Sequence, residues 1–203
     1  AIPVLTYTNE FENAEAAGSE KNDEANADVN VVLWSWCSIN GHDAQRYVDN
    51  MEKLIAEYPL VTFVFMTGHG NIAFSDAEAS RIRTYLENGG FIYADDDYGM
   101  DKAFRREIRK IFPDQSLVEL PFSHGIYHCV YDFPYGPPKT HEHDKKEPQG
   151  FGLFHDGRLV LYYTYESNPS DAWNDQEVHG DPPAKRDEAL RFGTNVLVWA
   201  LTH

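Results

Sequence analysis

The stretch VTFVFMTGHGNIAFSDAEASRIRTYLENGGFIYADDD (residues 61–97) contains one complete strand–helix–strand unit. Its first six residues are a nearly continuous apolar run, which is typical of a strand covered on both faces. Ser75 and Glu78 have the spacing of a capping box that starts a helix, and the glycines at 89–90 end it. FIYA (91–94) is then the next strand. The stretch therefore predicts two parallel strands joined by a right-handed helical crossover.

The same alternation continues on both sides of this unit. VVLWSW (31–36) favours a strand, and residues 43–58 have the apolar spacing of a helix. After residue 97, a helix with an apolar face reaches Pro113, and SLVEL (116–120) is a short strand. Three strand–helix units in succession predict an α/β fold with a mainly parallel sheet.

The C-terminal third has a different pattern. Residues 133–150 are rich in Pro, Gly, His and charge, and a loop of this length is usually functional or disordered. FGLFHDGRLVLYYTY (151–165) predicts a β-hairpin with Asp156 and Gly157 at its turn. After a second polar loop, Asp181 is predicted to be the N-cap of the last helix.

The sequence predicts one main domain, with a short preceding segment. Residues 1–30 are expected to form a strand (1–8) and an acidic loop or linker, and residues 31–203 a single α/β domain. A chain of 203 residues with 42% hydrophobic residues can bury a sizeable core. Since the chain begins at Ala1, we expect a processed or trimmed chain.

The net charge is −16, from 33 acidic and 17 basic residues, which argues against a nucleic-acid partner. No apolar run has the length of a membrane span, so we expect no membrane insertion. The two cysteines, Cys37 and Cys129, are expected either to pair or to remain as buried thiols.

Polar residues follow three predicted strands at the carboxyl edge of the sheet, where open parallel sheets bind their ligands. They are Cys37, the loop TGHGN (67–71) with His69, and DDDYG (95–99). One or two of the aspartates can act as metal ligands or as a general base. Alternatively, they cap the next helix, a role that Asp97 or Asp101 can fill alone. Both interpretations remain open.

Histidines are concentrated in the predicted loops. In HEHD (141–144), an extended backbone would point His141 and His143 to the same side, a geometry that can chelate one metal ion. His124 lies just upstream, and a mixed His and carboxylate shell suits Zn, Fe or Mn. The alternative is an exposed loop with incidental histidines.

Two further features each have two interpretations. In FRREIRK (104–110), Arg105 either enters the site, paired to Asp96 or to an anionic substrate, or lies on a solvated helix face. Trp173 either stacks on a sugar ring or anchors its own loop.

A resemblance adds to these expectations. The segments TGHGNIAFSDAEASRIRTYLENGGFIYADDDYGMDKAFRREIRKIFPDQSLVELP, IYHCVYDFP, PKTHEHDKKEPQGFGLFHDGRLVLYYTYES and DAWNDQEVHGDPPAKRDEALRFGTNVLVWALTH resemble a bacterial family of unknown function over about residues 61–203. The family is mostly exported, and its fold is similar to class I glutamine amidotransferase-like, flavodoxin-like domains. The resemblance implies a flavodoxin-like three-layer sandwich and a periplasmic or extracellular location. Residues 31–60 instead resemble a sequence segment found in other secreted bacterial proteins.

In amidotransferases of this class, the nucleophilic Cys stands on a sharp turn between strand and helix. FIYADDDYGMDKAF resembles that turn in position, but it contains Asp95, Asp96 and Asp97 instead of Cys. Glutaminase chemistry of the usual kind is therefore not expected.

Together, these features predict an exported, metal-dependent hydrolase-like enzyme with a site at the carboxyl edge of the sheet. Its metal would be a divalent Zn, Fe or Mn, which lowers the pKa of a bound water. The competing hypothesis is a non-catalytic module of the cell envelope that binds a small molecule, sugar or peptide, or docks a partner. The predicted catalytic residues are Asp97, Asp96 and Arg105, and the predicted metal ligands are His141, His143, His69, Asp95 and His124.

Overall fold

The computed structural model describes residues 4–7, 31–37, 62–141, 143–174 and 176–203, with side chains from residue 62 onward. Within these residues, seven strands form one sheet in the order β1-β2-β3-β4-β7-β6-β5. The strands are β1 (Val4–Tyr7), β2 (Val31–Cys37), β3 (Phe63–His69), β4 (Phe91–Tyr98), β5 (Val118–Glu119), β6 (Gln149–His155) and β7 (Arg158–Tyr165).

The sheet is mixed. Strands β1, β2, β3, β4 and β7 run parallel, whereas β6 pairs antiparallel with β7, and β5 pairs antiparallel with β6 at the edge. This confirms the α/β class, the mainly parallel sheet and the hairpin turn at Asp156 and Gly157, both of which have positive φ. A flavodoxin-like order is not confirmed, because β1 to β4 lie side by side in chain order, without the reversal typical of doubly wound sheets.

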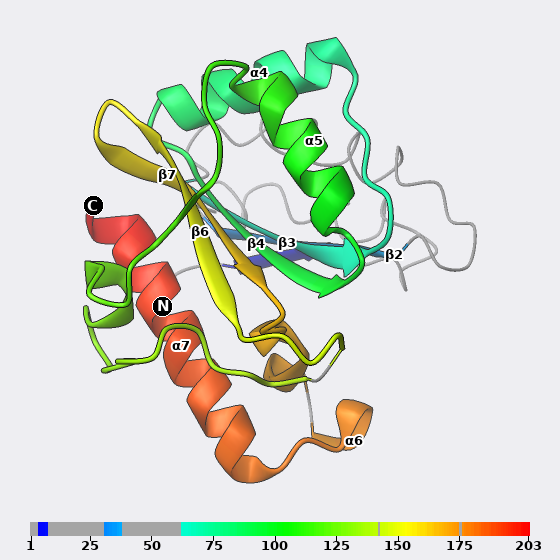
Figure 1. Cartoon of the computed structure of the whole chain (residues 1–203), viewed down its shortest axis with the longest axis vertical. Helices are drawn as coiled ribbons and strands as arrows, with labels where there is room; N and C mark the ends of the chain where they lie inside the picture. The colour runs from blue at the N-terminus through cyan, green and yellow to red at the C-terminus, as the bar shows by residue number, and fades with distance from the viewer. Residues whose placement is uncertain (1–3, 8–30, 38–61, 142, 175) are drawn as a thin grey trace, which may run out of the picture.

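Helices cover both faces of the sheet (Figure 1). The helices α4 (Asp76–Glu87) and α5 (Asp101–Ile111) lie on one face, and α7 (Pro183–Thr202) lies on the other. Strand β4 serves both cores, since Ile92 and Ala94 pack toward α4 and α5 while Phe91 and Tyr93 pack toward α7. The remaining described helices are short: η2 (Gly125–Tyr127), η3 (Pro169–Trp173) and α6 (Gln176–His179).

Several predicted element ends differ from the structure. Strand β4 continues to Tyr98, so all three aspartates belong to the strand instead of following it. The strand predicted over 116–120 is reduced to Val118–Glu119. Helix α7 begins at Pro183 with Pro182 as its N-cap, so the N-cap predicted at Asp181 is wrong. The helix predicted at 43–58 and the acidic loop at 9–30 lie outside the described residues.

The start of α4 agrees with the predicted capping box. The Ser75 hydroxyl accepts a hydrogen bond from the Glu78 N–H, and the Glu78 carboxylate accepts one from the Ser75 N–H. Replacing Ser75 with alanine removes one of these two bonds, so we expect the free energy of unfolding to fall by about 1 kcal/mol. Urea denaturation measures the change. Ser80→Ala, on the exposed face of the same helix, should cause no loss; equal losses would contradict the capping role.

The His-rich loop lies against the segment that follows β7. The Thr140 N–H donates to the Ser167 carbonyl at 2.8 Å, and the Ser167 hydroxyl donates to the Pro138 carbonyl at 2.6 Å. Strand β7 pairs in parallel with β4, so this contact brings the loop to the carboxyl end of β4. The carboxyl end of β4 and the His-rich loop are therefore neighbours.

Among the described residues, no helix is long and apolar enough to cross a membrane. Cys129 is a free thiol that donates to the Asn195 carbonyl at 3.3 Å, so it does not pair with Cys37. Burial raises its pKa.

Candidate functional site

Asp95 anchors η3 to the sheet. Its carboxylate is fully buried, and its Oδ2 accepts a hydrogen bond from the Ser170 N–H at 2.9 Å. Its Oδ1 lies 2.5 Å from the Thr164 hydroxyl. Burial raises the pKa of Asp95 to about 7, against the lowering effect of these hydrogen bonds. Both oxygens are engaged, one with η3 and the other with β7, so Asp95 is not placed as the metal ligand that the sequence suggested.

Asp96 points to the opposite face of β4 and supports the start of α5. Its Oδ1 accepts from the Met100 N–H at 3.0 Å, and its Oδ2 accepts from the Tyr163 hydroxyl at 3.3 Å. Burial raises its pKa to about 6. The helix-capping interpretation thus holds for Asp96, and not for Asp97 or Asp101 as proposed from the sequence.

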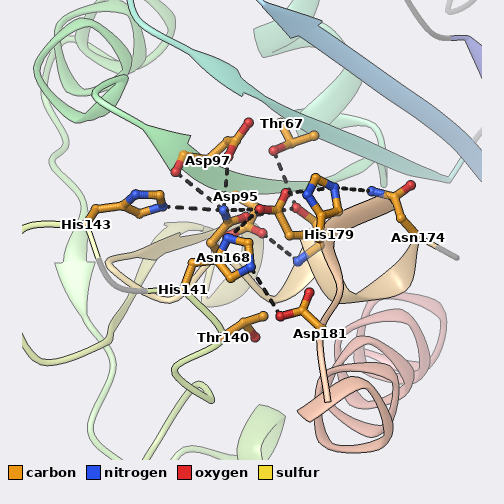
Figure 2. A network of polar contacts seen from close by, with 12 residues as sticks. Thr67, Asp95, Asp97, Thr140, His141, His143, Asn168, Asn174, His179 and Asp181 are labelled. Carbon is orange, nitrogen blue, oxygen red and sulfur yellow. Dashed lines mark hydrogen bonds and ion pairs between the residues drawn. The ribbon is translucent and has the colours of Figure 1, made fainter. Parts of the chain in front are cut away.

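Asp97 faces a network of histidines and polar side chains. Its Oδ2 lies 2.8 Å from the Nε2 of His69, at the end of the neighbouring strand β3. Its Oδ1 accepts a hydrogen bond from the Asn168 amide at 3.0 Å. Asn168 stands at the centre of this network (Figure 2), because the same amide nitrogen donates to the Asp171 Oδ2 at 2.8 Å. The structure therefore joins Asp97 and His69, as predicted, and adds Asp171.

His141 lies between two carboxylates. Its Nδ1 is 2.7 Å from the Asp171 Oδ2, and its Nε2 is 3.2 Å from the Asp181 Oδ1. Both contacts are hydrogen bonds when both ring nitrogens carry a proton. Asp181 is also nine-tenths buried, and its Oδ2 has no hydrogen-bond partner within the described part of the chain. An unpartnered buried carboxylate oxygen favours a proton or a cation nearby.

Two more histidines border this network (Figure 2). The Nε2 of His143 lies 3.5 Å from the Asn168 amide nitrogen, and its ring packs on Tyr98 at 4.8 Å. The Nε2 of His179 is 4.0 Å from the Asp171 Oδ1. His141 and His143 thus border the same network, as HEHD predicted, with ring centroids 6.3 Å apart.

The surroundings of Asp171 disfavour the negative charge of its carboxylate. Burial raises its pKa, and the nearby Asp97 carboxylate raises it further, while His141 and His179 act in the opposite direction. Two carboxylates held close by one amide group favour any cation that can sit between them. A cluster of this kind therefore suits a metal ion or a transferable proton.

The backbone supporting the site is strained. Glu166 and Asn168 have φ values of 55° and 47°, in the left-handed region that residues other than glycine rarely adopt. Both are buried, and Glu166 is held by the Lys139 ammonium at 3.0 Å. Strain of this kind persists only where surrounding contacts enforce it, and it clusters at functional sites.

Arg105 and His124 do not join the cluster. Arg105 pairs with Asp101 one helical turn earlier, at 2.7 Å, and its guanidinium lies over the Phe151 ring. His124 caps η2 and packs against Trp199, near the end of α7, whereas His141 contacts Asp181 just before α7 begins. Sixteen residues of helix separate Pro183 from Trp199, or about 24 Å.

The sequence analysis missed four residues of the network: Asp171, Asn168, Asp181 as a site residue, and His179 as a neighbour of Asp171. All belong to the polar loop 166–182 or to α6. The loop 166–182 is rich in Asn, Asp and His and lies between two regular elements, and this pattern could have identified these residues from the sequence. Trp173 does anchor this loop, since its indole N–H donates to the Ala189 carbonyl at 2.9 Å.

Within the described residues, no group of three or more His, Cys, Asp or Glu side chains is already arranged to hold a metal ion. Beside the network lies a cavity of about 370 Å³, lined by the ends of β4 and β7, the start of α5 and residues 143–146. Asp97 and His143 line this cavity and also belong to the network. The site thus combines a His/Asp cluster with an adjoining space for a small molecule.

These features define an α/β protein with a mixed sheet and a His/Asp cluster at its carboxyl edge. The chain belongs to the family described as Domain of unknown function (DUF4159), whose model matches residues 21–201. This match confirms the resemblance to a family of unknown function and includes residues 31–60, which the sequence analysis had set apart. No curated protein and no solved structure matches the chain.

Proposed function

We propose that the protein is a metal-dependent enzyme of the hydrolytic class, with Asp171, His141 and His179 as its metal ligands. The observation that supports this proposal is the position of the Asp171 carboxylate between the two imidazoles, at 2.7 Å from one and 4.0 Å from the other. One carboxylate and two histidines are a common ligand set for Zn and Fe. The resemblance noted above suggests a periplasmic or extracellular setting for this chemistry.

Metal binding would require these side chains to move, because His141 contacts the Asp171 Oδ2 and His179 lies nearest the Asp171 Oδ1. Tetrahedral ligands that each lie 2.0–2.1 Å from an ion are about 3.3 Å from one another. The contact of His141 with Asp171 would lengthen by less than 1 Å, and that of His179 would shorten by a similar amount. His179 would also leave the Asn174 amide, which now lies 3.2 Å from its Nε2.

Asp181 is well placed as the supporting carboxylate. Histidines that bind metals usually donate their other ring N–H to a carboxylate, which fixes the ring and raises its basicity. The Asp181 Oδ1 stands at that position, 3.2 Å from the Nε2 of His141. Its role is to orient His141, not to bind the ion.

The hydrolytic step needs a group that accepts a proton from water. A bound ion would polarise the water and lower its pKa. Asp97, held by His69 and the Asn168 amide, is the carboxylate proposed to take the proton. His69 orients Asp97 and stabilises its charge.

Metal content tests the proposed ligand set. Protein purified without chelator and dialysed against Zn, Fe or Mn should retain one ion per chain by elemental analysis. Asp171→Ala should retain less than roughly a tenth of that amount, and Asp181→Ala should bind about 10–100-fold more weakly. His155→Ala is the matched control, because His155 lies on the β6–β7 hairpin and contacts Asp156. Absence of bound metal, or equal metal in Asp171→Ala, contradicts the proposal.

Hydrolysis is tested separately. Metal-loaded protein is assayed on chromogenic esters, phosphate esters and glycosides, with Asp97→Asn beside the wild type. We expect activity on one substrate class and a loss of about 100-fold or more in Asp97→Asn with its metal content unchanged. A bound metal without activity on any of these classes would leave a metal site and remove the hydrolytic part of the proposal.

A further inference from the structure

The cavity beside the His/Asp cluster has a mixed polar lining. Its volume of about 370 Å³ lies toward the lower end of the range for small-molecule sites. The lining side chains discussed below are Tyr98, Tyr165, Lys102, Lys146, Asp97 and Asp101. With Asp96, Asp144 and Glu166 included, the wall holds five carboxylates, two lysines and two tyrosines, so it offers hydrogen-bond donors and acceptors together.

The five carboxylates of the lining and the Lys146 ammonium already have hydrogen-bond or ion-pair partners. Asp101 contacts Arg105 at 2.7 Å, and Asp97 contacts His69 at 2.8 Å. Lys146 donates to the Tyr165 hydroxyl at 2.7 Å and lies 3.5 Å from Asp144. The buried Glu166 carboxylate is paired with Lys139, and burial raises the pKa of Asp96 to about 6. A cationic ligand would therefore displace existing partners of the carboxylates, whereas a neutral one would not.

Hydroxyl-rich ligands fit such a lining. A hydroxyl group both donates and accepts, so it can donate to a paired carboxylate and accept from a paired ammonium without removing either partner. An anionic ligand meets five carboxylates, and a cationic ligand meets carboxylates that already have partners. The composition of the wall thus favours a neutral ligand with many hydroxyl groups.

Tyr98, one of the two tyrosines of the wall, supplies an apolar surface. Tyr98 is 48% exposed, although it ends a strand that is otherwise buried, and its ring packs on His143 at 4.8 Å. An exposed ring beside polar groups can cover the C–H face of a sugar, while the hydroxyls at the sugar's edge reach the charged pairs. A ligand with only hydroxyls would leave the Tyr98 ring uncovered, and a ligand with only apolar atoms would leave the polar groups of the wall uncontacted.

We propose that this cavity binds a sugar ring of a neutral carbohydrate, stacked on Tyr98. As a statement about the substrate, this inference rests on the proposed function, because Asp97 lines the cavity and is also the proposed base. As a statement about binding, it needs no metal, since Asp171, His141 and His179 are not lining residues of this cavity.

The test is calorimetry on the whole chain after treatment with chelator. The probes are neutral oligosaccharides of glucose, mannose, galactose, xylose and N-acetylglucosamine. We expect at least one to bind with a Kd of about 1 mM or tighter, and Tyr98→Ala to bind it at least roughly tenfold more weakly. Tyr135→Ala is the matched control, because Tyr135 is 83% exposed and does not line this cavity. Its affinity should equal that of the wild type.

Failure of this inference is distinguishable from failure of the proposed function. Binding of none of the neutral probes overturns the inference, as does tighter binding of a lysine hexapeptide or of an oligogalacturonate. An unchanged affinity in Tyr98→Ala overturns the assignment of the ligand to this cavity. None of these results depends on metal content, and loss of metal in Asp171→Ala does not depend on sugar binding.

Discussion

Glu107→Ala should lower the free energy of unfolding by about 3 kcal/mol. Glu107 is a buried carboxylate on α5, and three groups bind it: the Phe74 N–H at 2.7 Å, Lys110 at 2.8 Å and Arg106 at 2.5 Å. Its removal leaves the buried Phe74 N–H without a partner and a space where the side chain was. The two cations are partly exposed and can be hydrated, which limits the loss.

Urea denaturation of two further variants separates these contributions. Glu107→Gln keeps an oxygen that can accept from Phe74, so it should lose only about 1 kcal/mol. Glu87→Ala removes an exposed pair with Arg83 on α4 and should lose less than about 0.5 kcal/mol. If Glu107→Ala is no more destabilising than Glu87→Ala, the buried carboxylate does not hold the loop before α4.

The same pairing also steadies the site. Arg106, which contacts Glu107, donates to the Ile72 carbonyl at 2.6 Å and to the Asn71 side chain at 3.0 Å. Asn71 and Ile72 follow His69 by two and three residues in the chain. Through Arg106, the segment FRREIRK therefore contacts the loop beside the cluster.

Asp95→Asn should have a higher free energy of unfolding than the wild type at pH 8. The variant-minus-wild-type difference should be larger at pH 8 than at pH 5, by on the order of 3 kcal/mol. The pKa of Asp95 is about 7 in the folded chain, and that of an unfolded aspartate is about 3.9. Between these values the folded state binds the proton that the unfolded state has released. The contribution of Asp95 to stability is therefore complete below about pH 4 and is lost as the pH rises through about 7.

Asparagine cannot ionise, so the variant should lack this loss. It can still accept from the Ser170 N–H through its carbonyl and donate to the Thr164 hydroxyl, which keeps η3 in place. The measurement is the difference in unfolding free energy between variant and wild type from pH 4 to pH 8. Asp114→Asn, an exposed aspartate after α5, is the control and should give a flat difference. A flat difference for Asp95→Asn as well would show that Asp95 is ionised throughout.

Local contacts explain which elements the sequence predicted. The capping box of Ser75 and Glu78 spans three residues, and the hairpin turn at Asp156 and Gly157 needs only two residues with positive φ. Both can be recognised in a short stretch of sequence because their physical causes lie inside it. The predicted strand ended at residue 94, whereas β4 continues to Tyr98. The next three residues are aspartates, and strands are recognised in a sequence by their apolar side chains.

Distant contacts explain what was missed at the site. Asp95 binds Ser170, which is 75 residues later in the chain, and Asp96 binds Tyr163, which is 67 residues later. No periodicity in the sequence announces these partners. His124 was grouped with His141 because they are close in sequence, but α7 lies between their contacts. The proximity of Asp97 and His69 was predictable because parallel strands end at one edge. His141 and His143 reach the same place through the contacts of their loop with Ser167, which no strand pattern reveals.

The three aspartates of β4 have three different environments, and this has a consequence for comparing related sequences. At position 96 the requirement is an acceptor for a helix N–H, which Ser, Thr or Asn can also meet. At position 95 it is a small polar group that stays neutral at no penalty, which Asn meets better than Asp. At position 97 it is a negative charge beside His69. The three aspartates are therefore not equally diagnostic of the site. A related protein with other residues at positions 95 and 96 can keep the same site if it has a carboxylate at position 97.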